Sequence, residues 1–170
     1  WKEDRGELMT PEAVLAKALR YRHYWGDNGG ITVSGGEPLL QLDFVTELFA
    51  LAKKEGIHTT LDTAGEPFRE DETTLAAFDR LMAVTDLVLL DVKEIDPGKH
   101  RRLTGKPLAN ILAFAKYLEA KDKPVWIRHV LVPGWTDDDG DLRALHDFIA
   151  TLTNVKKTEV LPFHNLAQYK

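Results

Sequence analysis

The sequence predicts an α/β fold built on parallel strands. Short segments rich in Val, Ile, Leu and Thr have the composition of strands, and they occupy Ile31–Ser34, His58–Asp62, Leu87–Lys93, Trp126–Val132 and Thr158–His164. Longer segments with apolar residues at helical spacing separate them, over Pro11–Trp25, Leu42–Lys54, Glu72–Met82, Leu108–Glu119 and Asp139–Leu152. Because strands that alternate with helices pair in parallel through crossover connections, this order predicts a parallel sheet or barrel of about five βα units.

The first two βα units have clear boundary signals. Thr10 is a favourable N-cap, and Pro11 occupies the first helical position, where its missing N–H is not needed. The first strand is followed by a pair of glycines. The second helix ends in two lysines, Gly56 stands two residues after them, and glycine is the residue most typical of helix C-termini.

The third strand is defined by alternation. Side chains of a strand point alternately to two faces, so Leu89, Asp91 and Lys93 share one face, while Val92 belongs to the face that packs against helices. The fourth strand, VWIRHVLV, is apolar except for its Arg–His pair. A charge inside such a strand is rare unless it meets an anion or a carboxylate.

Composition narrows the functional classes. Within 170 residues, 44% are hydrophobic and 29% charged, the balance of one soluble globular domain. The net charge of −5 argues against nucleic acid or an anionic membrane as partner. Without a membrane-spanning run or an apolar signal region, we expect a cytoplasmic protein. There are no cysteines, which excludes disulfides and thiolate metal ligands within these residues.

Polar residues gather where the predicted strands end. Ligands bind at the carboxyl ends of parallel strands, so these residues are the first functional candidates. They are Gly35, Gly36 and Glu37 after the first strand, Asp62 and Thr63 after the second, Asp91 and Lys93 after the third, Arg128 in the fourth, and His164 after the last. Together they predict one polar rim.

Each candidate also has a structural interpretation. A glycine pair lets backbone approach a ligand closely, but glycine pairs also make plain tight turns. Asp91 and Lys93 line the rim or form an internal salt bridge. Thr63 caps a helix or contacts a ligand, and two close carboxylates, Asp62 and Asp91, favour a bound cation or a raised pKa. Histidines other than His164 are expected to be structural.

The segments in order resemble the glycyl-radical-enzyme activases of the radical S-adenosylmethionine superfamily, most closely those acting on pyruvate formate-lyase. The resemblance covers nearly the whole chain and is carried by YRHYWGDNGGITVSGGEPLLQ, KKEGIHTTLDTAG, VTDLVLLDVKEID, FAKYLEAKDKPVWIRHVLVPGWTDDD and KTEVLPFHNLAQYK. It implies a partial (β/α) barrel. SGGEP alone would be weak evidence, but the set is specific.

The resemblance also implies site roles. Gly35, Gly36 and Glu37 are similar to the segment that binds the amino group of S-adenosylmethionine through backbone and side chain. By the same comparison, Asp91, Val92, Lys93, Arg128 and His164 contact this cofactor. Asp62, Thr63, Asp91 and the carbonyl group of Leu89 are similar to a monovalent-cation site beside the methionyl carboxylate.

In this family a [4Fe–4S] cluster, held by a Cys-x-x-x-Cys-x-x-Cys loop, reduces S-adenosylmethionine and releases a 5′-deoxyadenosyl radical that takes hydrogen from a glycine. The implied partners are the glycyl radical loop of pyruvate formate-lyase and a flavodoxin-type or similar electron donor. No cysteine is present here to hold the cluster. We therefore expect residues 1–170 to form a single domain, incomplete at both ends and inactive alone.

Three alternatives remain at this point. The chain resembles activases of other glycyl radical enzymes in its cofactor motifs. A cluster-free, metal-dependent aldolase or isomerase barrel could use Asp62, Asp91, Lys93 and His164, with Lys93 as a Schiff-base or acid–base residue. A non-catalytic scaffold derived from the barrel would explain the missing cysteines.

Overall fold

The computed structural model describes residues 7–26 and 29–163, and within them the predicted parallel sheet is confirmed. The strands are β1 (Gly30–Val33), β2 (His58–Thr63), β3 (Leu87–Asp91), β4 (Val125–Leu131) and β5 (Val155–Pro162). They pair in chain order, each parallel to the next. The carboxyl ends of all five strands therefore lie along one edge.

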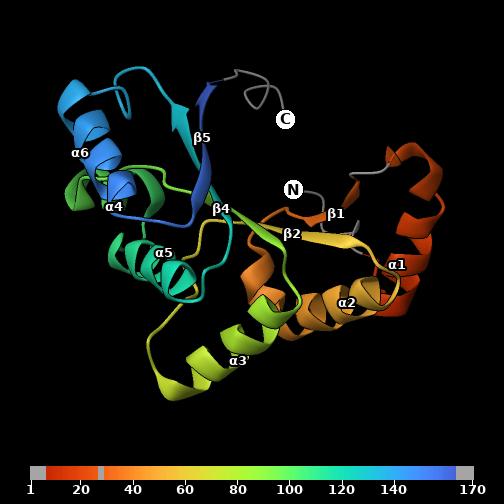
Figure 1. Ribbon diagram of the computed structural model, residues 1–170. Helices are drawn as coiled ribbons and strands as arrows, with labels where there is room; N and C mark the ends of the chain where they lie inside the picture. Colours follow the sequence, from red (N-terminus) through yellow and green to blue (C-terminus); the bar gives the residue numbers. More distant parts are fainter. Residues whose placement is uncertain (1–6, 27–28, 164–170) are drawn as a thin grey trace.

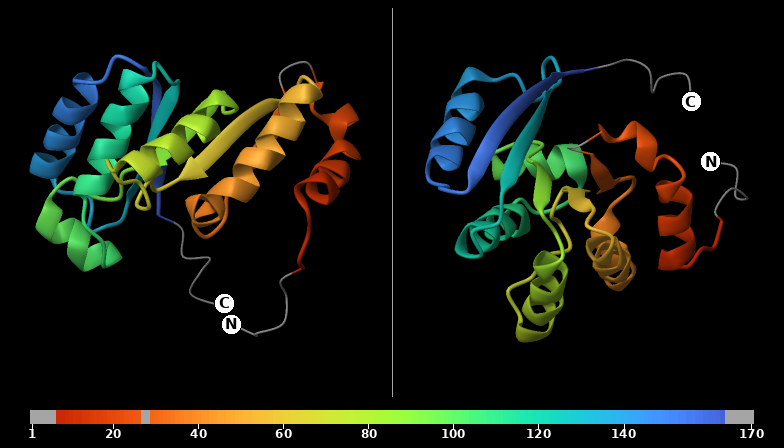
Figure 2. Two further views of the ribbon diagram at one scale, coloured as in Figure 1. Left: turned by 90° about the horizontal axis from the view of Figure 1, so that it is seen from below. Right: turned by 45° about the vertical axis from the view of Figure 1, so that its right-hand side comes forward.

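Helices cover the outer, convex face of this curved sheet (Figures 1 and 2). They are α1 (Pro11–Leu19), α2 (Leu42–Lys54), α3 (Glu72–Ala83), α4 (Pro97–Thr104), α5 (Ala109–Ala120) and α6 (Asp139–Ala150), with short 3-10 turns η1 (Arg22–Tyr24) and η3 (Pro38–Gln41). The curved sheet with helices outside is the partial barrel that the sequence predicts. Among the described residues, none of the helices is long and apolar enough to cross a bilayer.

Two helix predictions need correction. The first helix was expected to run to Trp25, but α1 ends at Leu19 and the chain continues into η1. Helix α4 was not predicted, because eight residues with one buried side chain, His100, carry almost no apolar periodicity. Its signals are local: Asp96 caps the N-terminus, proline follows, and Gly105 ends the helix with a φ of 74°.

The two faces of β3 separate apolar from polar chemistry as alternation predicts. Val88, Leu90 and Val92 are fully buried beneath the helices. Leu89 and Asp91 are only partly buried and belong to the opposite face. The same alternation on β4 places Arg128 with Asp91, its register partner, and buries His129 on the helix side. One strand therefore serves both the core and the rim.

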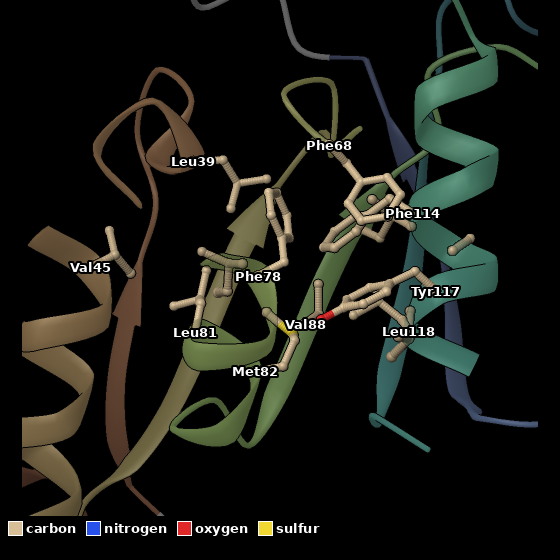
Figure 3. Close-up of a cluster of buried hydrophobic side chains, with 14 of the residues drawn as sticks. Leu39, Val45, Phe68, Phe78, Leu81, Met82, Val88, Phe114, Tyr117 and Leu118 are labelled. Carbon is tan, nitrogen blue, oxygen red and sulfur yellow. The ribbon is translucent and has the colours of Figure 1, made fainter. Parts of the chain in front are cut away.

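An aromatic cluster closes the core between α3, α5 and the loop after β2 (Figure 3). Phe68 contacts Phe78 at 5.0 Å between ring centroids and Phe114 at 5.3 Å, and all three are buried. Tyr117 joins through its ring and donates its hydroxyl to Asp79 at 2.6 Å. The cluster packs directly against Gly65, which stands just beyond β2 with a φ of 73°.

Asp86 joins the amino-terminal ends of two strands to a helix. Its carboxylate accepts from Lys53 at the end of α2 at 2.8 and 2.9 Å and from the Thr59 N–H at 2.8 Å. Burial alone would raise the pKa of Asp86, but these hydrogen bonds and the Lys53 charge together hold it below its ordinary value. The folded protein therefore favours the ionised carboxylate.

Gly65 tests the close packing of the aromatic cluster. A Cβ at this position would lie 2.7 Å from Phe114 and 3.1 Å from Leu90, whereas one at Gly105, which has nearly the same φ, meets nothing within 4 Å. Gly105→Ala should cost about 1–2 kcal/mol for the left-handed backbone, and Gly65→Ala about 1–3 kcal/mol more for overpacking. Urea unfolding of both variants measures the difference, and equal losses would contradict the packing argument.

The lowered pKa of Asp86 makes the stability of the fold depend on pH. Because the folded-state pKa is lowered, its stabilisation is present above the unfolded pKa of about 4 and is lost as pH falls below it. Asp86→Asn should cost about 1–3 kcal/mol at pH 7 and close to nothing near pH 2.5. Urea unfolding at both pH values checks this. Asp43→Asn, at an exposed ion pair, is the matched control. If Asp86→Asn lost the same stability at both pH values, the ionised Asp86 carboxylate would not be the source of the stabilisation.

Candidate functional site

The loops after β1, β2 and β3 meet Arg128 of β4 around one hollow at the carboxyl edge of the sheet. This pocket has a volume of about 290 Å³. Its walls are Ser34, Gly35, Gly36, Asp62, Thr63, Ala64, Asp91, Lys93 and Arg128. The structure thus brings together most of the side chains that the strand-end argument selected, although they come from four different strands.

The glycine pair forms an open edge of the pocket. Gly35 has a φ of 94° and Gly36 a φ of 26°, and a Cβ on either would meet nothing within 4 Å. The positive φ values explain why glycine suits this turn. The open space beside both residues leaves their peptide groups accessible from the pocket.

The carboxylate of Glu37 points into the protein and ties two rim loops together. It accepts from the Thr63 hydroxyl at 2.5 Å, from the Ala64 N–H at 3.0 Å and from the Leu39 N–H at 3.0 Å. Thr63, which is buried, also accepts from the Gly65 N–H at 2.9 Å. The Glu37 side chain therefore fixes the glycine loop against the end of β2, and it does not line the pocket.

Arg128 bridges the two aspartates of the rim. Its Nε donates to Asp91 Oδ1 at 3.0 Å, and its Nη2 forms a short ion pair with Asp62 Oδ1. All three side chains are about four-fifths buried, with exposures of 18% for Arg128, 21% for Asp62 and 19% for Asp91. A guanidinium can serve two carboxylates at once because its donors diverge in a plane.

Lys93 completes the charged cluster from the edge of the pocket. Its ammonium donates to Asp91 Oδ2 at 2.6 Å and remains 38% exposed. Burial raises the pKa of Asp62, and the charge of Asp91 acts in the same direction against the opposing effect of Arg128. The two carboxylates balance the two cations, so the cluster has no net formal charge.

Not every predicted site residue is among the pocket walls of the described structure. The side chain of Val92 is fully buried on the helix side, its N–H donates to the Arg128 carbonyl at 2.9 Å and its carbonyl accepts from His129, so it offers the pocket no side chain. Leu89 is not among the pocket walls. His164 lies outside the described residues. The closeness of Asp62 and Asp91 is explained by Arg128 without a bound cation.

The anchoring role of Thr63 and Glu37 was missed by reasoning from the sequence. A Thr directly after a strand and a Glu after two glycines are visible in the sequence. That they bond to each other depends on the parallel pairing of β1 with β2, which places their loops side by side. The contact could therefore be predicted only once the pairing of β1 with β2 was known.

The site fits an amino acid zwitterion, such as the methionyl part of S-adenosylmethionine. Lys93 and Arg128 supply donors for a carboxylate, and the open peptide groups at Gly35 and Gly36 together with Asp62 and Asp91 supply acceptors for an ammonium group. The residues present do not fit an iron–sulfur cluster, because the sequence has no cysteine.

Comparisons of sequence identify the family of the chain. The family model of the radical SAM superfamily matches residues 1–145. The pyruvate formate-lyase-activating enzyme of Streptococcus mutans is 54% identical over 99% of this chain, and that of Listeria monocytogenes is 51% identical over all of it. The chain spans 64% of the length of the first relative and 69% of the second.

Comparison of structures gives the same result. A crystal structure of a domain of pyruvate-formate lyase-activating enzyme from Bacteroides vulgatus matches with a TM-score of 0.72 and 28% identity. The match covers 81% of this chain and 83% of that domain. On the family model, the relatives and the shared fold, the chain belongs to the radical SAM superfamily and, within it, to the family of pyruvate formate-lyase-activating enzymes.

Proposed function

We propose that these residues form the S-adenosylmethionine-binding part of an enzyme that activates pyruvate formate-lyase by generating a glycyl radical. The single observation that carries the proposal is the charged pocket beside the open glycine loop, in a chain 54% identical to such an enzyme. The [4Fe–4S] cluster of the family supplies the electron for reductive cleavage of S-adenosylmethionine. Its ligands are absent from these 170 residues, so residues 1–170 are inactive alone.

Within this proposal the rim binds the two charged ends of the methionyl group. The backbone at Gly35 and Gly36 accepts from the ammonium group, and Glu37 holds that loop in place. Lys93 and Arg128 bind the carboxylate with donors that their contacts with Asp91 do not use. His164 is assigned to the nucleoside side by resemblance to the family.

Finer assignments follow from the same family membership. The protein substrate is the glycyl radical loop of pyruvate formate-lyase, a flavodoxin-type protein donates electrons, and the location is cytoplasmic. A monovalent cation between Asp62, Thr63, Asp91 and the Leu89 carbonyl would share the two carboxylates with Arg128, which contacts the Oδ1 atom of each. Tighter S-adenosylmethionine binding in potassium than in choline salts would support the cation.

The cluster-free aldolase or isomerase is the weaker alternative. Family membership argues against it. A Schiff-base lysine is typically isolated in an apolar pocket, whereas Lys93 forms an ion pair with Asp91. In the described part of the chain, no group of three or more His, Cys, Asp or Glu side chains could hold a metal ion. Activation of another glycyl radical enzyme is distinguished by measuring which protein acquires the radical.

Substitution of Lys93 tests whether the pocket binds S-adenosylmethionine. In the complete protein, Lys93→Ala should weaken S-adenosylmethionine binding about 10- to 100-fold, because a charged hydrogen bond to the carboxylate is lost. Isothermal titration calorimetry measures this. Lys106→Ala, an exposed lysine 3.9 Å from Glu66, is the matched control and should bind as the parent does. Unchanged affinity in Lys93→Ala would remove this residue from the site.

The lack of cysteines gives a second test. Residues 1–170, treated anaerobically with iron and sulfide, should retain no stable [4Fe–4S] centre after desalting, because thiolates are its ligands in this family. Absorption spectroscopy with iron and sulfide analysis measures the outcome. A stoichiometric cluster would mean that other side chains hold it and would contradict this interpretation.

A further inference from the structure

His129 is a buried histidine whose two ring nitrogens both face backbone carbonyl groups. Nδ1 lies 2.9 Å from the carbonyl oxygen of Val92, and Nε2 lies 3.0 Å from that of Thr136. The side chain is 3% exposed, on the helix side of β4. Its neighbour Arg128 faces the pocket, so the same strand contributes to the rim on one face and to this contact on the other.

Two carbonyl acceptors require two donors. A neutral imidazole has one N–H, so one of the two carbonyl oxygens would face a nitrogen lone pair at hydrogen-bond distance, which is repulsive. An imidazolium donates from both nitrogens. The desolvation that opposes a buried charge is offset when both donors make charge-assisted hydrogen bonds.

The two carbonyl groups belong to two different rim loops. The Val92 carbonyl is part of the planar peptide that continues into Lys93, so holding this oxygen fixes where the Lys93 side chain starts. Thr136 belongs to the loop between β4 and α6, where its hydroxyl donates to the Val130 carbonyl at 2.6 Å and accepts from the Val132 N–H at 2.8 Å. Thr136 is itself buried, and its loop folds back over the end of β4.

We propose that His129 is a positioning residue, protonated on both ring nitrogens, that ties the Val92–Lys93 peptide to the loop at Thr136 and thereby sets Lys93 for ligand binding. The proposal rests on the proposed function, because it assigns Lys93 to the methionyl carboxylate. His129 does not touch the pocket and acts only through the peptide that it holds. Neither His129 nor Thr136 is among the residues that the family resemblance selected for the site.

A ring that merely fills space would behave differently from one that donates. His129→Phe keeps an aromatic ring and removes both donors, while His129→Gln keeps a donating amide that reaches one carbonyl group at a time. His129 also lines a second pocket, between α6 and strands β4 and β5, and Leu145→Ala removes a buried side chain from the wall of that pocket without changing either carbonyl contact of His129. It is the control for general destabilisation, and exposed His146→Gln is the control for loss of a histidine.

The first experiment observes the ring directly in the unaltered complete protein. Long-range ¹H–¹⁵N correlation spectra at pH 7 distinguish an imidazolium from either neutral tautomer, and the His129 signals are assigned by their loss in His129→Gln. Both nitrogens of His129 should carry a proton. An unprotonated ring nitrogen would overturn the proposal, and this result does not depend on whether the protein binds S-adenosylmethionine.

The second experiment measures the consequence for the ligand. By calorimetry with S-adenosylmethionine, His129→Phe should lose roughly tenfold in affinity, since small displacements of a binding group are costly, and His129→Gln should recover part of this. Leu145→Ala and His146→Gln should bind as the parent does. Parental affinity in His129→Phe, or an equal loss in Leu145→Ala, would refute the positioning role. Absence of binding by the parent protein would refute the proposed function instead.

Discussion

The rim depends on the contact of Arg128 with two aspartates. Asp62 and Asp91 stand on neighbouring strands with their side chains four-fifths buried, and without a cation between them their mutual repulsion and desolvation would be unfavourable. Arg128 supplies that cation from the next strand of the sheet. These contacts are internal to the protein and hold the three side chains together at the carboxyl edge of the sheet.

Around this cluster, backbone and side-chain contacts hold the loops that a ligand would meet. Glu37 binds the glycine loop to the end of β2, and His129 binds the peptide before Lys93 to the loop after β4. Neither side chain reaches the pocket. The backbone hydrogen bonds between parallel strands stop where the strands end. The loops beyond them therefore need side-chain contacts such as these to keep a fixed position relative to one another.

Much of the fold was predictable because its signals are periodic. The helix at 42–54 has the predicted bounds, and all five predicted strands exist within the described residues, with ends that moved by a few positions. Helix α4 was not predictable in this way, since its caps are clear but its apolar pattern is not. The rim candidates on β1 to β4 were correctly grouped because parallel strands end at one edge, whereas His164 lies beyond the described residues.

The sequence by itself determined which residue types stand at the strand ends, which face of β3 each side chain takes, and that no cysteine is available for a cluster. These properties are local, since they follow from composition and from the alternation of a strand. Only the tertiary structure decided that Arg128 pairs with both aspartates, that Glu37 faces inward, and that His129 lies between two carbonyl groups. Each of these contacts joins residues at least 26 positions apart or across a folded loop, and no local pattern encodes such distances.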